Sequence, residues 1–259
     1  MNYPDIGVVV PTLGKRPEYL LQCLRSLRDA GNALIYLVMP ESVSLPHEIN
    51  SDLYDRVITD PGIGLAAAIH AGLSSFPESV RYINWLGDDN LLVEGSLDKT
   101  SEVLRNDEDV ILVFGGCDYI NKTNQVIFTN KSGRYAVRLM RVGPQLIPQP
   151  GALFRRDAYE KIGGLNSDLR WAFDLDLLIR LSKMGKLQFM NLTLGSFRWH
   201  DGSLSVGGRD GSVREASSVR KHFLPNSLRP LSELWEGPMR YAIKYIGMIV
   251  SRRSVSPVA

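Results

Sequence analysis

Cysteine is scarce in this sequence of 259 residues, and its scarcity excludes several classes of protein. The two cysteines, Cys23 and Cys117, are far apart and lack the short spacing of metal-binding cysteine pairs. A disulfide framework and a cysteine-based metal site are therefore excluded. Such cysteine usage is typical of a protein from a reducing compartment.

Net charge and long apolar runs are also missing. The 30 basic and 28 acidic residues give a formal net charge of +2, which is too small to indicate nucleic acid as a partner. No apolar run approaches the roughly 20 residues that span a bilayer. The first residues, Met1–Asp5, lack the basic and apolar regions of a signal peptide. We therefore expect a cytoplasmic protein, or one held peripherally on the inner face of the cell membrane, with no nucleic-acid partner.

The first half of the chain alternates apolar strands with amphipathic helices. Continuous apolar runs are the mark of strands that are covered on both faces. Their alternation with helices predicts a parallel, doubly wound sheet. The expected strands cover Ile6–Pro11, Ala33–Met39, Val80–Leu86 and Val110–Phe114, and the expected helices cover Glu18–Asp29, Leu65–Leu73 and Ser96–Leu104.

The pattern changes after Gly116, where strands and helices no longer alternate. Turn-forming residues separate two short strands, which predicts an antiparallel hairpin. We interpret this half as an elaboration of the same sheet rather than a separate domain. The expected strands cover Asp118–Ile120 and Gln125–Phe128, and the expected helices cover Arg156–Ile162 and Asp174–Met184, the latter with Leu177, Leu181 and Met184 facing inward.

An acid pair follows the third expected strand. Asp88 and Asp89 come after a run rich in β-branched and aromatic residues, and carboxylates at the end of a buried strand are costly unless a cation offsets their desolvation. Ligands of open α/β sheets bind at the carboxyl ends of strands. The pair therefore indicates a divalent metal that in turn holds phosphates, and the alternative is a solvated turn.

Two further pairs are candidates for chemistry. Asp174 and Asp176 open an expected helix, where a carboxylate either caps free N–H groups or serves as a general base. Residues two apart on a helix do not share a face, so at most one of them points into a site. Arg198 and His200 lie two apart on an expected strand and do share a face. They suit a diphosphate clamp or a metal ligand, and the alternative is a structural histidine.

Two loops are candidates for phosphate contacts. The turn Gly62–Gly64 precedes a helix whose N-terminus can receive phosphate, although a plain turn explains it equally well. Lys15 and Arg16 follow the first strand. For these two residues we favour a solvated loop over a phosphate contact.

Taken in order, five segments between Ile6 and Ser205 resemble motifs of the family 2 glycosyltransferases, which have the GT-A fold. They resemble the family's opening strand, its Asp-x-Asp metal motif, the block before its catalytic acid, the acidic catalytic motif and the late Arg-x-His segment. The segments are Ile6–Thr12 (IGVVVPT), Gly87–Asn90 (GDDN), Gln149–Arg156 (QPGALFRR) with Ile162–Leu165 (IGGL), Phe173–Asp176 (FDLD) with Leu178–Leu181 (LIRL), and Phe197–His200 (FRWH).

The resemblance implies an α/β GT-A fold, with a mostly parallel central sheet flanked by helices and a smaller antiparallel elaboration on the acceptor side. It implies an inverting, hexosyl-type transfer from a nucleotide-diphosphate sugar, with a UDP-sugar favoured, to a glycan or lipid-linked acceptor in bacterial surface polysaccharide or lipid-linked glycan biosynthesis. Asp174 would be the general base. Mn²⁺ or Mg²⁺ would be held by Asp89, Asp88 and His200, and the donor by Pro11, Thr12, Glu41, Gly64, Asp88, Asp89 and Arg198.

Three positions depart from the family's pattern. Gly87 stands at the first position of the Asp-x-Asp motif, and Phe173 replaces the glutamate before the catalytic aspartate. Met39–Ser42 replaces the acidic cluster after the second strand, so that Glu41 alone remains to contact the base. The nucleotide and the metal dependence stay open for these reasons. The rival interpretations are a sugar nucleotidyltransferase and a non-catalytic nucleotide-sugar or glycan-binding module.

The last segment mixes basic and apolar residues. From Arg220 onward seven lysines and arginines outnumber two glutamates. This composition suits an interfacial segment on an anionic membrane, and the alternatives are a helix packed on the domain or a homodimer contact. We expect a glycosyltransferase domain over residues 1–220 and a basic, apolar helical tail over residues 221–259.

Overall fold

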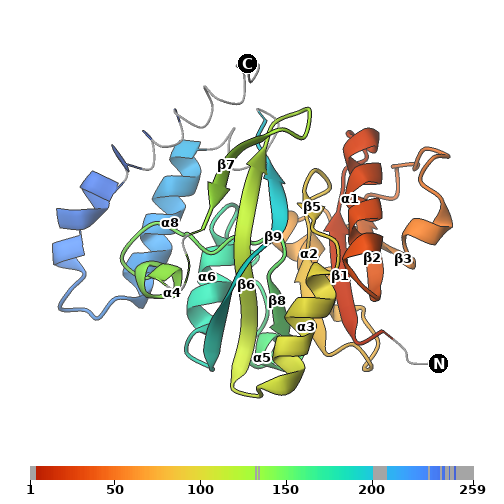
Figure 1. Ribbon diagram of the computed structural model, residues 1–259. Helices are drawn as coiled ribbons and strands as arrows, with labels where there is room; N and C mark the ends of the chain where they lie inside the picture. Colours follow the sequence, from red (N-terminus) through yellow and green to blue (C-terminus); the bar gives the residue numbers. More distant parts are fainter. Residues whose placement is uncertain are drawn as a thin grey trace.

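The computed structural model describes residues 4–131, 133, 135–200, 209–232, 234–239, 241, 242, 245 and 248. These residues form a nine-stranded sheet with helices packed on it (Figure 1). The strand order is β3-β2-β1-β4-β8-β6-β9-β5, and β7 pairs with β6. The α/β architecture with a mostly parallel sheet, which the sequence predicted, is confirmed.

The N-terminal part of the chain forms a parallel half-sheet. β1 (Ile6–Pro11) is hydrogen-bonded in parallel to β2 (Ala33–Met39) on one side and to β4 (Tyr82–Trp85) on the other. β3 (Arg56–Thr59) extends this half-sheet beside β2 and has no counterpart among the expected strands. Three of its four residues are exposed, so it lacks the continuous apolar run that marks the other strands.

Helices cover both faces of this half-sheet, as a doubly wound arrangement requires. α1 (Pro17–Ala30) packs on the face that Val8 and Val10 reach. α2 (Leu65–Ser74) packs on the face that Val9 reaches. Alternate residues of β1 are therefore buried in two different cores, which explains why the whole strand is apolar.

The other half of the sheet is built around two long strands. β6 (Val110–Ile120) and β9 (Lys186–Arg198) run in parallel, and β7 (Val126–Asn130) returns beside β6 as the second strand of the predicted hairpin. β6 is longer than expected because it continues through Gly115, where a Cβ would lie 2.5 Å from the Leu192 carbonyl oxygen. This close approach of two backbones explains why glycine interrupts the apolar pattern.

Short strands and helices complete the second half. β8 (Leu153–Arg155) pairs antiparallel with β4 and β6 and so joins the two halves, and β5 (Leu91–Leu92) pairs antiparallel with β9. The helix α8 (Arg209–Phe223) runs across residue 220, the position at which the sequence predicted a domain boundary. That boundary stays a prediction. The helices are α3 (Ser96–Asn106), α4 (Tyr135–Leu139), α5 (Arg156–Lys161), α6 (Phe173–Leu181) and α8 (Arg209–Phe223), and the 3₁₀ turns are η1 (Ser51–Leu53) and η2 (Pro230–Ser232).

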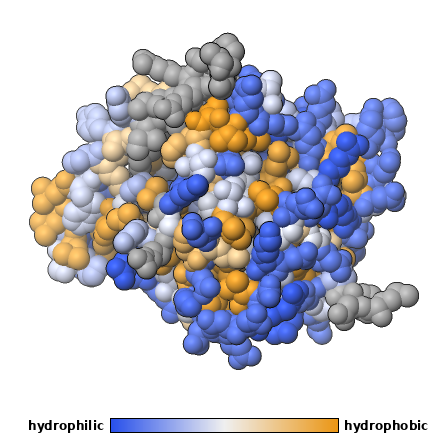
Figure 2. Space-filling view, viewed as in Figure 1, coloured by the Kyte–Doolittle hydropathy of each residue, from blue (hydrophilic) through white to orange (hydrophobic). Residues whose placement is uncertain are grey.

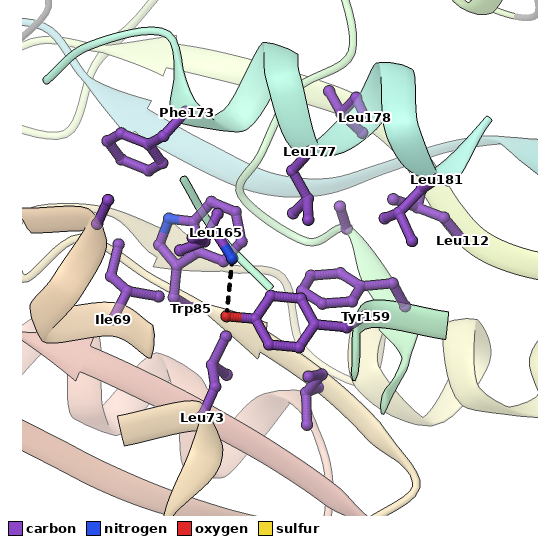
Figure 3. Packing of buried hydrophobic residues seen from close by; sticks show 14 of the residues in the cluster. Ile69, Leu73, Trp85, Leu112, Tyr159, Leu165, Phe173, Leu177, Leu178 and Leu181 are labelled. Carbon is purple, nitrogen blue, oxygen red and sulfur yellow. Dashed lines mark hydrogen bonds between the residues drawn. The ribbon is translucent and has the colours of Figure 1, made fainter. Parts of the chain in front are cut away.

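α6 supplies much of the core beneath the second half. Figure 3 shows Leu177 and Leu181 on the side of α6 that faces the ring of Tyr159. The Tyr159 hydroxyl accepts a hydrogen bond from the Leu165 backbone N–H at 3.3 Å. Leu177 and Leu181 are buried, as expected, but Met184 is 47% exposed. The expectation for Met184 was wrong because α6 ends at Leu181, where the chain turns away from the helix axis.

Apolar side chains gather on the outside of the segment that follows α8. Figure 2 shows them at the left margin, where Figure 1 draws this part of the chain. Leu231 is 49% exposed and Leu234 is 74% exposed, whereas Glu236 is buried in an ion pair with Arg220 of α8. Across the described residues, no helix is long and apolar enough to cross a membrane. Most of the expected tail beyond residue 239 lies outside the described residues.

Candidate active site

A cleft of about 440 Å³ opens at the carboxyl-terminal edge of the parallel half-sheet. Asp88 and Asp89 line it just beyond the end of β4, where ligands of α/β sheets bind. Asp174 of α6 lines the same cleft, together with Ser212 and Val213 of α8. The fold thus brings the predicted acid pair and the predicted base to one cleft.

Thr12 and Asp88 are joined across the ends of neighbouring strands. The Thr12 hydroxyl donates a hydrogen bond to Asp88 Oδ2 at 2.6 Å, and both residues are buried. Burial raises the pKa of Asp88, while the hydrogen bond from Thr12 and the charge of Arg16 oppose that rise. Pro11, the last residue of β1, lines the cleft.

Arg16 bridges the two acids, which corrects our expectation of a solvated loop at this residue. Its guanidinium lies 2.5 Å from Asp88 Oδ1, 2.7 Å from Asp89 Oδ2 and 3.0 Å from His200 Nε2. The Arg16 side chain is 33% exposed, whereas the two acid side chains are only 5% and 10% exposed. Two carboxylates held this close need a cation, and Arg16 supplies it. Lys15 is exposed, as expected.

Arg198 and His200 both reach Asp89, in agreement with their spacing on a strand. His200 Nε2 lies 2.8 Å from Asp89 Oδ2, and Arg198 donates from Nε to the Asp89 carbonyl oxygen at 2.9 Å. Arg198 is fully buried, with its guanidinium 4.2 Å from the Tyr19 ring centre and hydrogen-bonded to the Gln22 side chain. Burial lowers its pKa. Neither Arg198 nor His200 is among the described residues that line the cleft, and both contact Asp89, which does line it.

Asp174 and Asp176 have different surroundings at the start of α6. Asp174 Oδ2 accepts a hydrogen bond from Gln145 Nε2 at 3.3 Å, and its Oδ1 accepts one from the Leu175 backbone N–H at 2.7 Å. Burial raises the pKa of Asp174, which suits a general base. Asp176 is buried in an ion pair with Arg180 at 2.5 Å and does not line the cleft. Of the two acids, Asp174 is the one that can act in the cleft.

Glu215 of α8 holds the start of α6, and no local pattern in the sequence predicts it. Its carboxylate accepts hydrogen bonds from three consecutive backbone N–H groups, those of Arg170 at 3.0 Å, Trp171 at 2.6 Å and Ala172 at 2.7 Å. A carboxylate from another helix therefore fixes the backbone that leads into α6, up to two residues before Asp174. The bonded residues are 43 to 45 positions apart, which is why helix-capping patterns do not reveal the contact.

Glu41 and Gly64 lie near the same edge of the sheet but not in the lining of the cleft. Glu41 follows β2 and is exposed, with the Thr59 hydroxyl 3.5 Å from its carboxylate. Gly64 precedes α2 with φ at +118°, a conformation that favours glycine, and nothing lies within 4 Å of where its Cβ would stand. The next residue, Leu65, lines the cleft. Contact of Glu41 or Gly64 with a nucleotide stays a prediction.

The acid pair offers suitable donors for a divalent cation, but Arg16 already engages them. Carboxylate oxygens and an imidazole nitrogen are ligands that Mn²⁺ accepts, and Mg²⁺ prefers the oxygens. Here Asp88, Asp89 and His200 converge on a guanidinium that stands in for such a cation. In the described part of the chain, no three acidic, histidine or cysteine side chains form a ready metal-ligand group. The residue types suit a divalent metal, but the described side chains do not form a metal site and Arg16 engages the carboxylate oxygens.

No family model and no curated protein matches this sequence. Its structure does resemble solved ones. S. aureus TarS 1–349 matches with a TM-score of 0.62 at 13% identity, over 92% of this chain and 71% of that one. The same fragment in complex with UDP-GlcNAc matches with a TM-score of 0.63 at 10% identity, over 87% of this chain and 69% of that one. The mannosyltransferase PcManGT from Pyrobaculum calidifontis, in complex with GDP-Man and Mn²⁺, matches with a TM-score of 0.64 at 14% identity, over 98% of this chain and 76% of that one. At such identities the likeness establishes that this chain shares the fold of these proteins.

Proposed function

We propose that this chain is a glycosyltransferase that moves a sugar from a nucleotide-diphosphate donor to a hydroxyl of an acceptor, with inversion at the anomeric carbon. The observation that carries the proposal is a single cleft lined both by an acid pair with its cation (Asp88, Asp89 and Arg16) and by a separate, partly exposed carboxylate, Asp174. Charged groups at strand ends suit a diphosphate, and a carboxylate with a raised pKa that lines the cleft suits a base. The structural neighbours in complex with UDP-GlcNAc and with GDP-Man support this donor class.

Asp174 would activate the acceptor. As the acceptor oxygen attacks the anomeric carbon, its proton passes to the Asp174 carboxylate and a new carbon–oxygen bond forms. The bond from the anomeric carbon to the diphosphate oxygen breaks, and its electron pair leaves with the nucleoside diphosphate. Attack from the face opposite the leaving group inverts the configuration. The raised pKa of Asp174 makes it a stronger base than an exposed carboxylate.

The acid pair and Arg16 would hold the donor's diphosphate. Arg16 lines the cleft, and by turning from the carboxylates to the phosphates it would exchange one set of anionic oxygens for another. When bound at Asp88, Asp89 and His200, Mn²⁺ or Mg²⁺ would neutralise charge on the diphosphate. Arg198 would position Asp89 rather than touch the donor, since it is bonded to the backbone of Asp89 and lies outside the cleft lining. A UDP-sugar is the donor that we favour.

The finer parts of the proposal concern pathway and location. We infer a glycan or lipid-linked acceptor in bacterial surface polysaccharide assembly, and a place in the cytoplasm or on the inner face of the membrane. The basic and apolar composition of residues 221–259 supports membrane contact, and the exposed Leu231 and Leu234 equally support contact between two copies. Deletion of residues 238–259 tests the membrane contact by vesicle co-sedimentation, and unchanged binding would contradict it.

A thermal-shift panel of nucleoside diphosphates and their sugars, with and without Mn²⁺, tests the function. Binding to the folded state raises Tm by mass action, so a shift identifies the donor. If no nucleotide in the panel raises Tm, the proposal is contradicted. Asp174→Asn then separates an enzyme from a binding module, because an enzyme loses transfer while the nucleotide-dependent shift remains. A sugar nucleotidyltransferase would instead release pyrophosphate from a nucleoside triphosphate and a sugar phosphate.

A further inference from the structure

The strand that supports the acid pair also presents aromatic rings to the cleft. Side chains alternate along the end of β9 and the residues that follow it. Arg198 and His200 reach Asp89, whereas Phe197 and Trp199 line the cleft. The proposed donor chemistry uses the polar set alone, which leaves the aromatic set to be explained.

Tyr119 of β6 forms an aromatic cluster with Phe197 and Trp199. Tyr119 pairs in register with Phe197, and their ring centres are 5.4 Å apart. The Tyr119 and Trp199 ring centres are 5.9 Å apart. All three side chains line the cleft and are partly exposed rather than sealed in the core. Asp174, the proposed base, belongs to the same lining of the cleft.

A fourth ring lines the cleft from the side of α6 and α8. Trp171 precedes α6, and its indole N–H is buried with no hydrogen-bond partner among the described residues. α8 packs directly on this ring, since a Cβ on Gly211 would lie 2.7 Å from it. A buried donor without an acceptor is costly, and an oxygen of a bound ligand could satisfy it.

The charge of the residues that line the cleft disfavours an anionic ligand, although the guanidinium of Arg170, outside that lining, lies 4.8 Å from the Trp171 ring centre. Arg16 is the basic residue in the described lining of the cleft, and it is engaged by Asp88 and Asp89. Asp174 adds negative charge near the rings, so a phosphate-rich acceptor would be repelled. Aromatic faces are partially negative and attract the partially positive C–H groups on the face of a sugar ring. A neutral sugar therefore complements this part of the cleft.

We propose that Tyr119, Phe197, Trp199 and Trp171 form the acceptor subsite, and that it takes the ring of a neutral sugar with a hydroxyl directed at Asp174. The inference rests on the proposed glycosyltransferase function. It selects the neutral end of a glycan over a phosphate-rich acceptor.

Saturation-transfer NMR tests the subsite without requiring turnover. The neutral probes are methyl β-glucopyranoside and methyl α-mannopyranoside, and the anionic probe is glycerol 3-phosphate, each added with UDP or GDP present. Trp199→Leu removes a ring of the cluster, and Trp199→Phe keeps one. Phe128→Leu is the matched control, because the Phe128 ring lies 5.5 Å from Tyr119 and is 41% exposed but does not line the cleft. Circular dichroism melts of each variant report folding.

We expect wild-type protein to saturate both glycosides and not glycerol 3-phosphate. Trp199→Leu should weaken glycoside binding by about fivefold to tenfold, the size of one aromatic contact, whereas Trp199→Phe restores most of it and Phe128→Leu leaves it unchanged. Equal glycoside binding by Trp199→Leu and Phe128→Leu would overturn the subsite, as would a preference for glycerol 3-phosphate.

The nucleotide thermal shift, read on the same samples, separates this inference from the proposed function. Absence of any shift in the wild-type protein contradicts the glycosyltransferase proposal itself. A shift that Trp199→Leu retains in full is the expected result for an acceptor residue. A shift that Trp199→Leu loses would assign the ring to the donor and overturn the acceptor subsite.

Discussion

Removal of the Arg16 guanidinium tests whether it stands in for a metal at the acid pair. In Arg16→Gln, Asp88 and Asp89 lose the cation that lies 2.5 and 2.7 Å from their oxygens. Deleting one partner of a buried ion pair costs about 3–5 kcal/mol, and an exposed pair contributes about 0–1 kcal/mol. Because Arg16 is 33% exposed while the acids are nearly buried, we expect a loss of about 1–3 kcal/mol, or roughly 2–12 °C in Tm.

The assay is a thermal melt near neutral pH without nucleotide, with and without Mn²⁺. A ligand at 100 times its Kd adds about 2.7 kcal/mol of stability, so excess Mn²⁺ should restore most of what Arg16→Gln loses. The wild-type protein should respond less, because Arg16 competes for the same oxygens. Burial already raises the pKa of Asp88, and without the opposing charge of Arg16 this pKa should rise further above its unfolded value. The ionised form of Asp88 is then destabilising, and the deficit should fade as the pH falls from the folded value toward the unfolded one.

Arg28→Gln is the matched control for Arg16→Gln. Arg28 is 30% exposed and lies 3.1 Å from Asp55, which is itself 34% exposed. Loss of this surface pair should cost about 1 kcal/mol or less and should create no response to Mn²⁺. If Arg16→Gln matches Arg28→Gln in both its Tm and its Mn²⁺ response, the guanidinium does not stand in for a cation.

Three further substitutions test the base, its support and the segment after α8. Asp174→Asn should lower transfer by about 10²–10⁴-fold in a kinetic assay. It should also raise Tm near neutral pH, because burial raises the pKa of Asp174 and makes its ionised form costly in the folded state. That gain should vanish as the pH falls and the wild-type carboxyl becomes protonated. Glu215→Ala should cost about 1–3 kcal/mol of stability, because three backbone N–H groups lose their acceptor, and it should slow transfer without weakening nucleotide binding. The control is Glu160→Ala, a change at an exposed residue, which should leave transfer and Tm nearly unchanged. Glu236→Ala should cost about 3–5 kcal/mol in a denaturation experiment, because it leaves Arg220 buried without its partner, and an unchanged midpoint would show that this pair contributes nothing.

The sheet could be predicted where each strand carries its own signal. Ala33–Met39 is apolar throughout because helices cover both faces of the half-sheet, and β2 has the same bounds as the expected strand. This signal, a continuous apolar run, is absent where a strand is not covered on both faces. β3 (Arg56–Thr59) is an edge strand with exposed side chains, and β9 (Lys186–Arg198) is buried at only some of its positions, so its long middle part has no continuous apolar run.

The site could be predicted only in part, because its groups act in pairs that come from distant segments. Asp88 and Asp89 are marked by the strand before them, and Asp174 by the helix that it opens. Arg16 is 72 and 73 positions from its two acid partners, and a lone arginine in a loop is ordinary. Glu215 lies in a polar helix that carries no sign of the backbone groups it binds. Only the folded chain brings these partners together.

The register of β9 couples the two sides of the cleft. Because alternate side chains face opposite ways, Arg198 can hold the acid pair only while Phe197 and Trp199 face the cleft. A shift of the strand by one residue would exchange the two sets, so that the rings would face the carboxylates and the charged side chains would face the proposed acceptor subsite. Gly195 helps to fix this register, since a Cβ there would lie 2.9 Å from the Leu91 carbonyl oxygen on β5. The proposed donor support and the proposed acceptor subsite therefore depend on the same few backbone contacts, so a substitution that moves this strand should impair both together.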